Sequence, residues 1–302
     1  MKPSSSAIDD LIAAERLPAE FRQTVDAYYV PLAARIIDLR RHMARPIVVG
    51  ICGSQGSGKS TAAVFLKALL EAHANLNTAV LSLDDLYLSH ETRQQLAAEA
   101  HPLLQTRGVP GTHDVALGCE VIEKLSTAAP DDVTRLPRFD KANDTVAPCE
   151  EWPAFKGRAD VVIFEGWCVG ARAQRADALI NPINDLERME DKDGRWRRYV
   201  NDKLAGEYVN LFSRLDYLVF LCAPGFDCVY DWRAKQERKL AEKVKPSDAA
   251  ARVMNDAELR RFIMHYERLT RHIMDEMPGY ADVVFNLDAN QSIISIKMRL
   301  DA

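Results

Sequence analysis

The segment 53–61 (GSQGSGKST) has the residue types and spacing needed to grip a polyphosphate. Gly53, Gly58, Lys59 and Ser60 fit the phosphate-loop pattern G-x-x-x-x-G-K-[ST]. Glycines let backbone N–H groups approach phosphate oxygens, and a helix that begins there adds positive potential. We therefore predict that this loop binds the phosphates of ATP, with Lys59 on the β- and γ-phosphates and Ser60 on Mg²⁺. The predicted contacts are Gly53, Ser54, Gln55, Gly56, Ser57, Gly58, Lys59, Ser60 and Thr61.

The flanking sequence predicts the strand and the helix that a phosphate loop requires. Residues 47–52 form a short apolar run, and apolar residues recur at helical spacing after Ser60. Further apolar runs without alternation predict strands that are buried on both faces, at 78–83, 160–164, 216–222 and 282–287. Helical patterns separate them, most clearly over 196–215 and 249–277. The expected fold class is α/β, a doubly wound parallel sheet.

Acidic residues at the ends of these strands are candidates for phosphoryl-transfer chemistry. Asp84 and Asp85 end the second predicted strand, and Glu165 ends the third. Ligands of open parallel sheets bind beyond the carboxyl ends of the strands, so these acids should face the phosphate loop. Asp84 is the expected catalytic base, and Ser60, Glu165 and Asp84 are the candidate metal ligands. Helix capping is the alternative for the aspartates, and a surface charge is the alternative for Glu165.

Composition narrows the class of protein. The chain has 302 residues, a hydrophobic content of 47% and a net charge of -5, which is ordinary for a globular protein and argues against a nucleic-acid binder. The six cysteines contain no C-x-x-C pair, which argues against zinc and suits a reducing compartment. No signal-like or membrane-spanning stretch is evident, so we expect a cytoplasmic protein without a membrane partner. Oligomeric state stays open.

We expect a helical leader over 1–45 that packs on the core, and a phosphate-loop kinase domain over 46–302. Pro31 interrupts the apolar pattern of the leader and predicts a kink or two helices. A role of the leader in binding a partner protein is the alternative. The segment 89–158 is rich in loop signals, and we interpret it as a substrate-binding insertion over the active face.

Several segments together resemble the D-glycerate 3-kinases of plants, fungi and bacteria. The phosphate loop is shared by many kinases, whereas the later segments are far more specific. They follow the family's order through most of the chain after residue 46, and the stretch 168–195 is weakly matched. The matching segments are GSQGSGKST (53–61), SLDDLYL (82–88), RGVPGTHD (107–114), PRFDK (137–141), FEGW (164–167), YDWR (230–233) and RFIMHYERLT (261–270).

This resemblance implies an ATP- and Mg²⁺-dependent kinase that phosphorylates the 3-hydroxyl of D-glycerate. It implies substrate-binding roles for Asp85, Tyr87, Arg107, His113 and Lys141, with Arg138 a weaker candidate. Arg233, on a basic helix, would close over ATP as a third catalytic residue beside Asp84 and Lys59. The alternatives are a surface salt bridge for Arg107, a packed loop histidine for His113 and a solvated face for the basic helix.

Two other functions compete with glycerate phosphorylation. One is a kinase for another small hydroxylated metabolite, such as pantothenate or a nucleoside. The other is a nucleotide-dependent switch ATPase that binds a partner protein, whose activity would not depend on an added alcohol. Release of ADP that depends on the acceptor separates a kinase from a switch.

Overall fold

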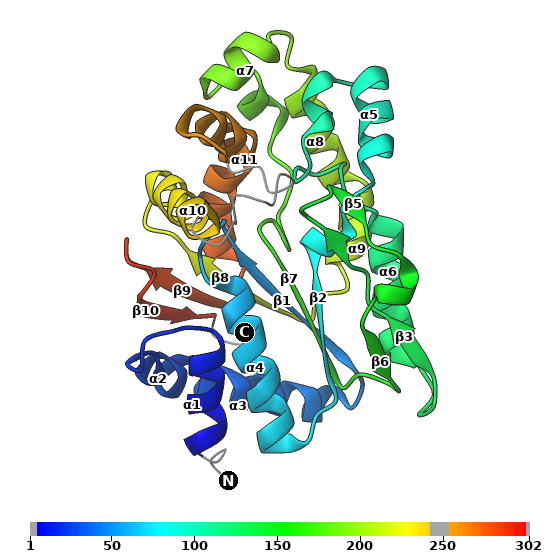
Figure 1. Ribbon diagram of the computed structural model, residues 1–302, viewed down its shortest axis with the longest axis vertical. Coiled ribbons are helices and arrows are strands. Elements are labelled where there is room, and N and C mark those ends of the chain that lie inside the picture. The colour runs from blue at the N-terminus through cyan, green and yellow to red at the C-terminus, as the bar shows by residue number, and fades with distance from the viewer. Residues whose placement is uncertain (1–4, 242–253, 300–302) are drawn as a thin grey trace.

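The computed structural model describes residues 5–241 and 254–299, which fold around one main β-sheet (Figure 1). The strand order is β10-β9-β8-β1-β7-β2, and every neighbouring pair is parallel except β9 and β10. The strands are β1 (Ile47–Gly53), β2 (Thr78–Ser82), β7 (Val161–Gly166), β8 (Tyr217–Cys222), β9 (Val283–Leu287) and β10 (Ile293–Met298). The doubly wound α/β fold that the apolar runs predict is therefore confirmed.

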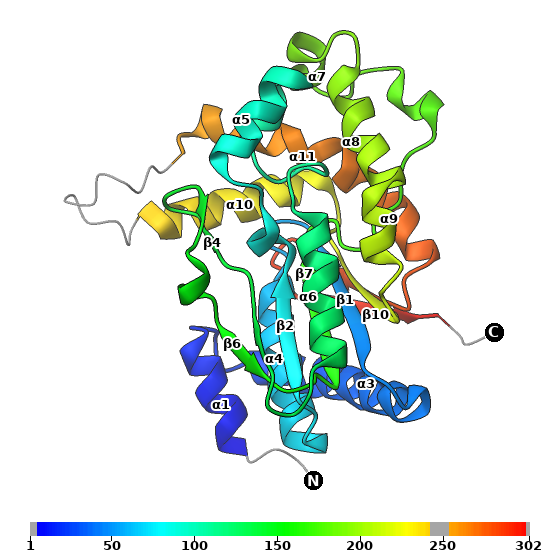
Figure 2. The same cartoon turned by 90° about the vertical axis from the view of Figure 1, so that its right-hand side faces the viewer.

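Helices cover both faces of this sheet (Figures 1 and 2). The α-helices are α1 (Ser5–Ala14), α2 (Phe21–Thr24), α3 (Val30–Met43), α4 (Lys59–Ala74), α5 (His90–Glu99), α6 (Val115–Thr127), α7 (Asp185–Glu190), α8 (Arg195–Ala205), α9 (Glu207–Phe212), α10 (Phe226–Ala241) and α11 (Asp256–Glu276). Val49 and Ile51 of β1 share a core with α1–α4 and α10, whereas Val48 and Cys52 share a second core with α6, α8 and α9. Burial on both faces explains why the strands read as continuous apolar runs.

The helical leader packs on α4 and the sheet. The Phe21 ring lies 5.3 Å from the Phe65 ring of α4, and Leu32 and Ile36 of α3 are fully buried. A π-helical turn, Val25–Tyr29, joins α2 to α3 without a break, and Pro31 lies just after this turn, in the first turn of α3. A division of the chain into leader and kinase domain stays a prediction.

Three elements differ from the sequence expectation. The predicted helix 196–215 is two helices, because the backbone breaks at Gly206 between α8 and α9. Strand β10 was not predicted, and it adds antiparallel to the edge of the sheet with several exposed side chains. Helix α11 begins at Asp256 with an Asn255 capping box, and residues 249–253 of the predicted helix lie outside the described residues.

The segment 89–158 contains more regular structure than its loop signals suggest. Helix α6 packs on the sheet through Val121, Ile122 and Leu125, so this part belongs to the second core. Two short hairpins follow, β3 (Val133–Arg135) with β6 (Ala154–Lys156), and β4 (Phe139–Asp140) with β5 (Thr145–Val146). We call residues 138–147 the acceptor hairpin below.

The two ends of the parallel strands carry different acids. Asp160, Asp216 and Asp282 precede β7, β8 and β9, and each accepts a backbone N–H of a neighbouring segment. The phosphate loop, Asp84 and Glu165 lie at the opposite, carboxyl edge of β1, β2 and β7. This separation agrees with the sorting of the acids by strand end.

Candidate active site

The phosphate loop joins β1 to α4 in a conformation that requires glycine. Gly56 and Gly58 have φ angles of 79° and 88°, which L side chains rarely adopt. The hydroxyls of Ser54 and Ser57 are buried and have no hydrogen-bond partner among the described residues. Such unpartnered groups beside a helix start suit a polyphosphate ligand.

Helix α10 and the β9–β10 connection support this loop from behind. A Cβ atom on Gly56 would lie 2.6 Å from Trp232 Cβ, so α10 approaches the loop as closely as glycine permits. Trp232 donates its indole N–H to Ala289 O at 2.8 Å, and Gln291 donates to Gly56 O. The neighbouring Arg233 pairs with Glu237 one turn further along α10. Its contact with a phosphate stays a prediction.

Next to Lys59, the side chains of Ser60 and Glu165 bring a hydroxyl oxygen and a carboxylate close together. The Ser60 hydroxyl donates to Glu165 Oε1 at 3.0 Å, and Ser82 donates to the same oxygen at 2.9 Å. Glu165 Oε2 is buried and has no hydrogen-bond partner in the described part of the chain. Residues 5–241 and 254–299 contain no group of three or more His, Cys, Asp or Glu arranged to hold a metal ion. A hydroxyl and one carboxylate still fit Mg²⁺, which commonly keeps few protein ligands and takes the rest from phosphates and water.

Asp84 lies just after β2 in the 3₁₀ turn Leu83–Leu86, with both carboxylate oxygens engaged. Tyr87 donates to Oδ1 at 2.7 Å and Lys141 donates to Oδ2 at 2.6 Å. Burial raises the pKa of Asp84, but the charges of Lys141 and Lys59 outweigh burial and hold that pKa below its usual range. Asp84 is therefore an ionised group with two donors on it. Its oxygens contact neither Ser60 nor Glu165 through any hydrogen bond of the described structure.

Asp85 points to the acceptor hairpin. Its Oδ2 accepts from Arg138 at 3.1 Å and its Oδ1 accepts the Phe139 N–H at 3.1 Å. Burial raises the pKa of Asp85, and the bonds from Phe139 and Arg138 oppose that rise. Asp85 thus anchors the hairpin, and the Arg138 side chain that bonds it is 56% exposed.

Arg107 meets a carboxylate of the protein itself. Its guanidinium pairs with Asp144 at the tip of the acceptor hairpin and lies 5.5 Å from the Phe139 ring centre. Asp144 also accepts from His90 at 2.9 Å and pairs with the buried Arg93 at 2.6 Å. This cluster has the chemistry of a carboxylate site, although the carboxylate in it belongs to the chain.

The loop 107–114 is rigid because its backbone is bonded on every side. Gly108 has a φ of 125°, and a Cβ atom there would lie 1.9 Å from the Tyr266 hydroxyl. Trp167 donates to Gly108 O at 2.8 Å, and Tyr266 donates to Arg107 O at 2.9 Å. The Thr112 hydroxyl closes the turn by accepting from Gly108 N and donating to Val109 O.

His113 is buried at the end of this loop, stacked on the Tyr87 ring with centroids 4.9 Å apart. Its Nδ1 lies 2.6 Å from the Tyr208 hydroxyl, which also accepts from Gly111 N at 3.0 Å. Burial lowers the pKa of His113 to about 3, so the imidazole is neutral. Because Tyr208 accepts from Gly111, we infer that its own proton goes to Nδ1 and that the imidazole proton lies on Nε2. That Nε2 atom is buried with no partner among the described residues.

Replacing Tyr208 with phenylalanine should lower the free energy of unfolding by about 1–3 kcal/mol, because two buried polar groups lose their partner. Urea unfolding followed by circular dichroism measures the change. Tyr28→Phe is the control, since it removes one part-buried bond to Ile293 O at 3.2 Å and leaves that carbonyl near solvent. An equal loss in both variants would contradict the role of Tyr208.

A cavity of about 930 Å³ lies between α5, α6, α8 and α9. Gly111 and His113 line it, whereas neither the phosphate loop nor Asp84 does. We place the site at the carboxyl edge of the sheet because the phosphate loop, Asp84 and Glu165 converge there. Judged by size alone, the cavity between α5, α6, α8 and α9 would have been chosen as the site instead.

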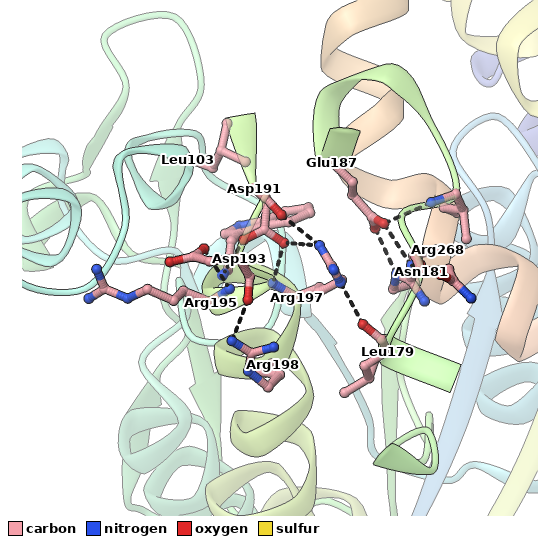
Figure 3. A network of polar contacts seen from close by, with 12 residues as sticks. Leu103, Leu179, Asn181, Glu187, Asp191, Asp193, Arg195, Arg197, Arg198 and Arg268 are labelled. Carbon is pink, nitrogen blue, oxygen red and sulfur yellow. Dashed lines mark hydrogen bonds and ion pairs between the residues drawn. The ribbon is translucent and has the colours of Figure 1, made fainter. Parts of the chain in front are cut away.

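A buried ionic network beyond this edge holds the weakly matched stretch 168–195 in place (Figure 3). Arg268 of α11 forms bonds of 2.7 and 2.6 Å to the two carboxylate oxygens of Glu187. Arg197 of α8 donates to Asp191 Oδ2 at 2.8 Å and to Leu179 O at 2.7 Å. All four charged side chains are buried, so each needs its partner.

Strand β1, the glycine loop, helix α4 and the Ser60–Glu165 pair together form the P-loop arrangement that many kinases share. The chain belongs to the family of P-loop kinases that includes the D-glycerate 3-kinases. It is 33% identical over 236 residues, 74% of this chain and 79% of the relative, to the uncharacterized kinase mug58 of Schizosaccharomyces pombe. No family model matches the chain.

Two further relatives are D-glycerate 3-kinases. The chain is 28% identical over 228 residues to the chloroplastic D-glycerate 3-kinase of Arabidopsis thaliana, covering 73% of this chain and 46% of that protein. The solved structure of D-glycerate 3-kinase from Cryptococcus neoformans superposes with a TM-score of 0.69 at 26% identity, covering 93% of this chain and all of that one (100%). These comparisons establish an ATP-dependent kinase.

Sequence reasoning missed several residues of this edge. Ser82 begins the SLDDLYL segment but was given no role, yet it bonds Glu165. Tyr208 and Asp144 reach the predicted loop from 95 and 37 residues away in the chain. The spacing of residues along the sequence does not indicate such long-range contacts.

Proposed function

We propose that the protein transfers the γ-phosphoryl group of ATP to the 3-hydroxyl of D-glycerate. The proposal rests on one observation: Asp84, Lys141 and Arg107 lie close together beside the phosphate loop. All three belong to segments that resemble D-glycerate 3-kinases. Glycerate is a small carboxylate with two hydroxyls, so its site needs a base for a hydroxyl and cations for the carboxylate.

In the proposed reaction, Asp84 takes the proton of the acceptor hydroxyl as its oxygen attacks the γ-phosphorus. The bond from that phosphorus to the β–γ bridging oxygen breaks, and ADP leaves with the electron pair. Lys59 and Arg233 stabilise the charge on the transferred group. His113, Tyr87 and Asp85 complete the acceptor site, by contact or by positioning Asp84 and the hairpin.

Mg²⁺ would be held by Ser60 and Glu165. When bound, it offsets negative charge on the phosphates. The unpartnered Glu165 Oε2 is the feature that supports this assignment. Asp84, also a candidate ligand by sequence, is assigned to the base because, among the described residues, it shares no hydrogen bond with the Ser60–Glu165 pair.

A panel of acceptors tests the proposal. D-glycerate, L-glycerate, pantothenate and uridine are each supplied with MgATP, and products are identified by mass and phosphorus NMR. We expect phosphorylation of D-glycerate on its 3-hydroxyl. Efficient phosphorylation of pantothenate or uridine alone would replace this proposal with the related kinase activity. ADP release without any acceptor dependence would favour the switch ATPase.

Replacing Arg107 with alanine should raise the KM for D-glycerate by about 10- to 100-fold. This is the change expected when one charge-assisted hydrogen bond of about 1.5–3 kcal/mol is lost. The KM for ATP should change much less. Steady-state kinetics with each substrate varied in turn measures both constants. Equal effects on both would assign Arg107 a structural role through its pair with Asp144.

The cytoplasmic location stays a prediction. The six cysteines are free thiols. Among the described residues, none of the helices is both long and apolar enough to cross a membrane.

A further inference from the structure

Asp84 and Lys141 form an ion pair where the acceptor hydroxyl would have to react. Both carboxylate oxygens of Asp84 already accept hydrogen bonds, one from Lys141 at 2.6 Å and one from Tyr87 at 2.7 Å. A carboxylate that is stabilised by an ammonium group is a weak base. Proton transfer to Asp84 therefore becomes easier once Lys141 leaves.

Lys141 is free to leave while its backbone stays fixed. Its side chain is 56% exposed, whereas that of Asp84 is 26% exposed. The hairpin that carries Lys141 is anchored before it by Phe139 on Asp85 and after it by Asp144 on Arg93. A flexible four-carbon stem on a fixed backbone lets the ammonium move between two carboxylates.

A second anion that binds beside Arg107 would lie within reach of the Lys141 ammonium group. Arg107 Nη2 lies 3.4 Å from Lys141 O, so the two residues adjoin. A carboxylate bound beside Arg107 would compete with Asp84 for the same ammonium group. Asp85 already accepts one hydrogen bond on each carboxylate oxygen, from Arg138 and from the Phe139 N–H.

We propose that Lys141 passes from Asp84 to the anionic group of the acceptor, so that the base is released only when a charged acceptor is bound. The proposal rests on the proposed function and deepens it. It makes Lys141 a specificity-determining residue that selects acceptors with a carboxylate. It also explains how the kinase would avoid transferring phosphate to water, since Asp84 stays paired with Lys141 until a charged acceptor arrives.

The test replaces Lys141 with methionine, which keeps the length of the side chain and removes its charge. We expect the hydrolysis of ATP without acceptor to rise about tenfold, a part of the 10²–10⁴-fold that a general base contributes. The preference in kcat/KM for D-glycerate over glycerol should fall by at least as much. Lys156→Met is the matched control, because Lys156 pairs with Asp131 instead and its loss should change neither quantity.

A second variant keeps the outcome decisive. Lys141→Arg, which keeps a cation at this position, should keep both the slow hydrolysis and the preference for D-glycerate. Unchanged hydrolysis and unchanged acceptor preference in Lys141→Met would overturn the proposal. If wild-type protein fails to phosphorylate D-glycerate, the proposed function falls, while acceptor-free hydrolysis in Lys141→Met and Lys141→Arg still decides the role of Lys141.

Discussion

Replacing Asp84 with asparagine should lower the turnover of acceptor phosphorylation by about 10²–10⁴-fold and leave ATP binding close to wild type. Asparagine keeps an oxygen for the Tyr87 hydroxyl and nearly the same volume, so the turn after β2 should persist. Asparagine has no basic carboxylate, so no group at this position can accept the proton of the acceptor hydroxyl. Steady-state kcat and the Kd of a fluorescent ATP analogue measure the two effects separately.

The control for this variant is Asp131→Asn, which removes an equal charge from a surface aspartate that is 95% exposed and paired with Lys156. It should leave both constants unchanged. Turnover of Asp84→Asn within a few-fold of wild type would remove Asp84 from the base role. An equally large loss of ATP affinity would instead assign Asp84 to the nucleotide or its metal.

Replacing Arg268 with methionine should lower the free energy of unfolding by about 3–5 kcal/mol, because it leaves the Glu187 carboxylate buried without its cation. Glu187 is 0% exposed, and Arg268 donates to both of its carboxylate oxygens. Arg268 also holds Ala178 O at 2.8 Å and Asn181 O at 2.7 Å, so the stretch before α7 would lose its anchor on α11. Urea unfolding measures the loss.

The matched control is Arg261→Met on the same helix. Arg261 pairs with Glu190, and these side chains are 48% and 42% exposed, so the loss should stay below about 1 kcal/mol. The double variant Glu187→Leu, Arg268→Met should recover much of the stability, since it removes both buried charges. A single Arg268→Met variant no less stable than Arg261→Met would contradict the role of this network.

The local pattern of apolar residues was sufficient to predict the main strands and helices of the fold. The strands are continuous apolar runs because both faces of the sheet are covered, and that cause is visible in any short window of sequence. The break at Gly206 escaped prediction because apolar spacing continues from α8 into α9, which share one core through Leu204, Tyr208 and Leu211. Strand β10 (IISIKM) is largely apolar, yet it was not predicted; it lies at the edge of the sheet, and most of its side chains are exposed.

The amino-acid sequence alone determined the phosphate loop, its strand and helix, and the edge of the sheet on which Asp84 and Glu165 lie, because backbone geometry and strand polarity follow from local residue types. Only the tertiary structure decided the partners of those groups. Asp84 meets Lys141 across 57 residues and His113 meets Tyr208 across 95. Contacts of that range depend on how the loops between them fold back, and that requires the packed core as well as the pattern along the chain.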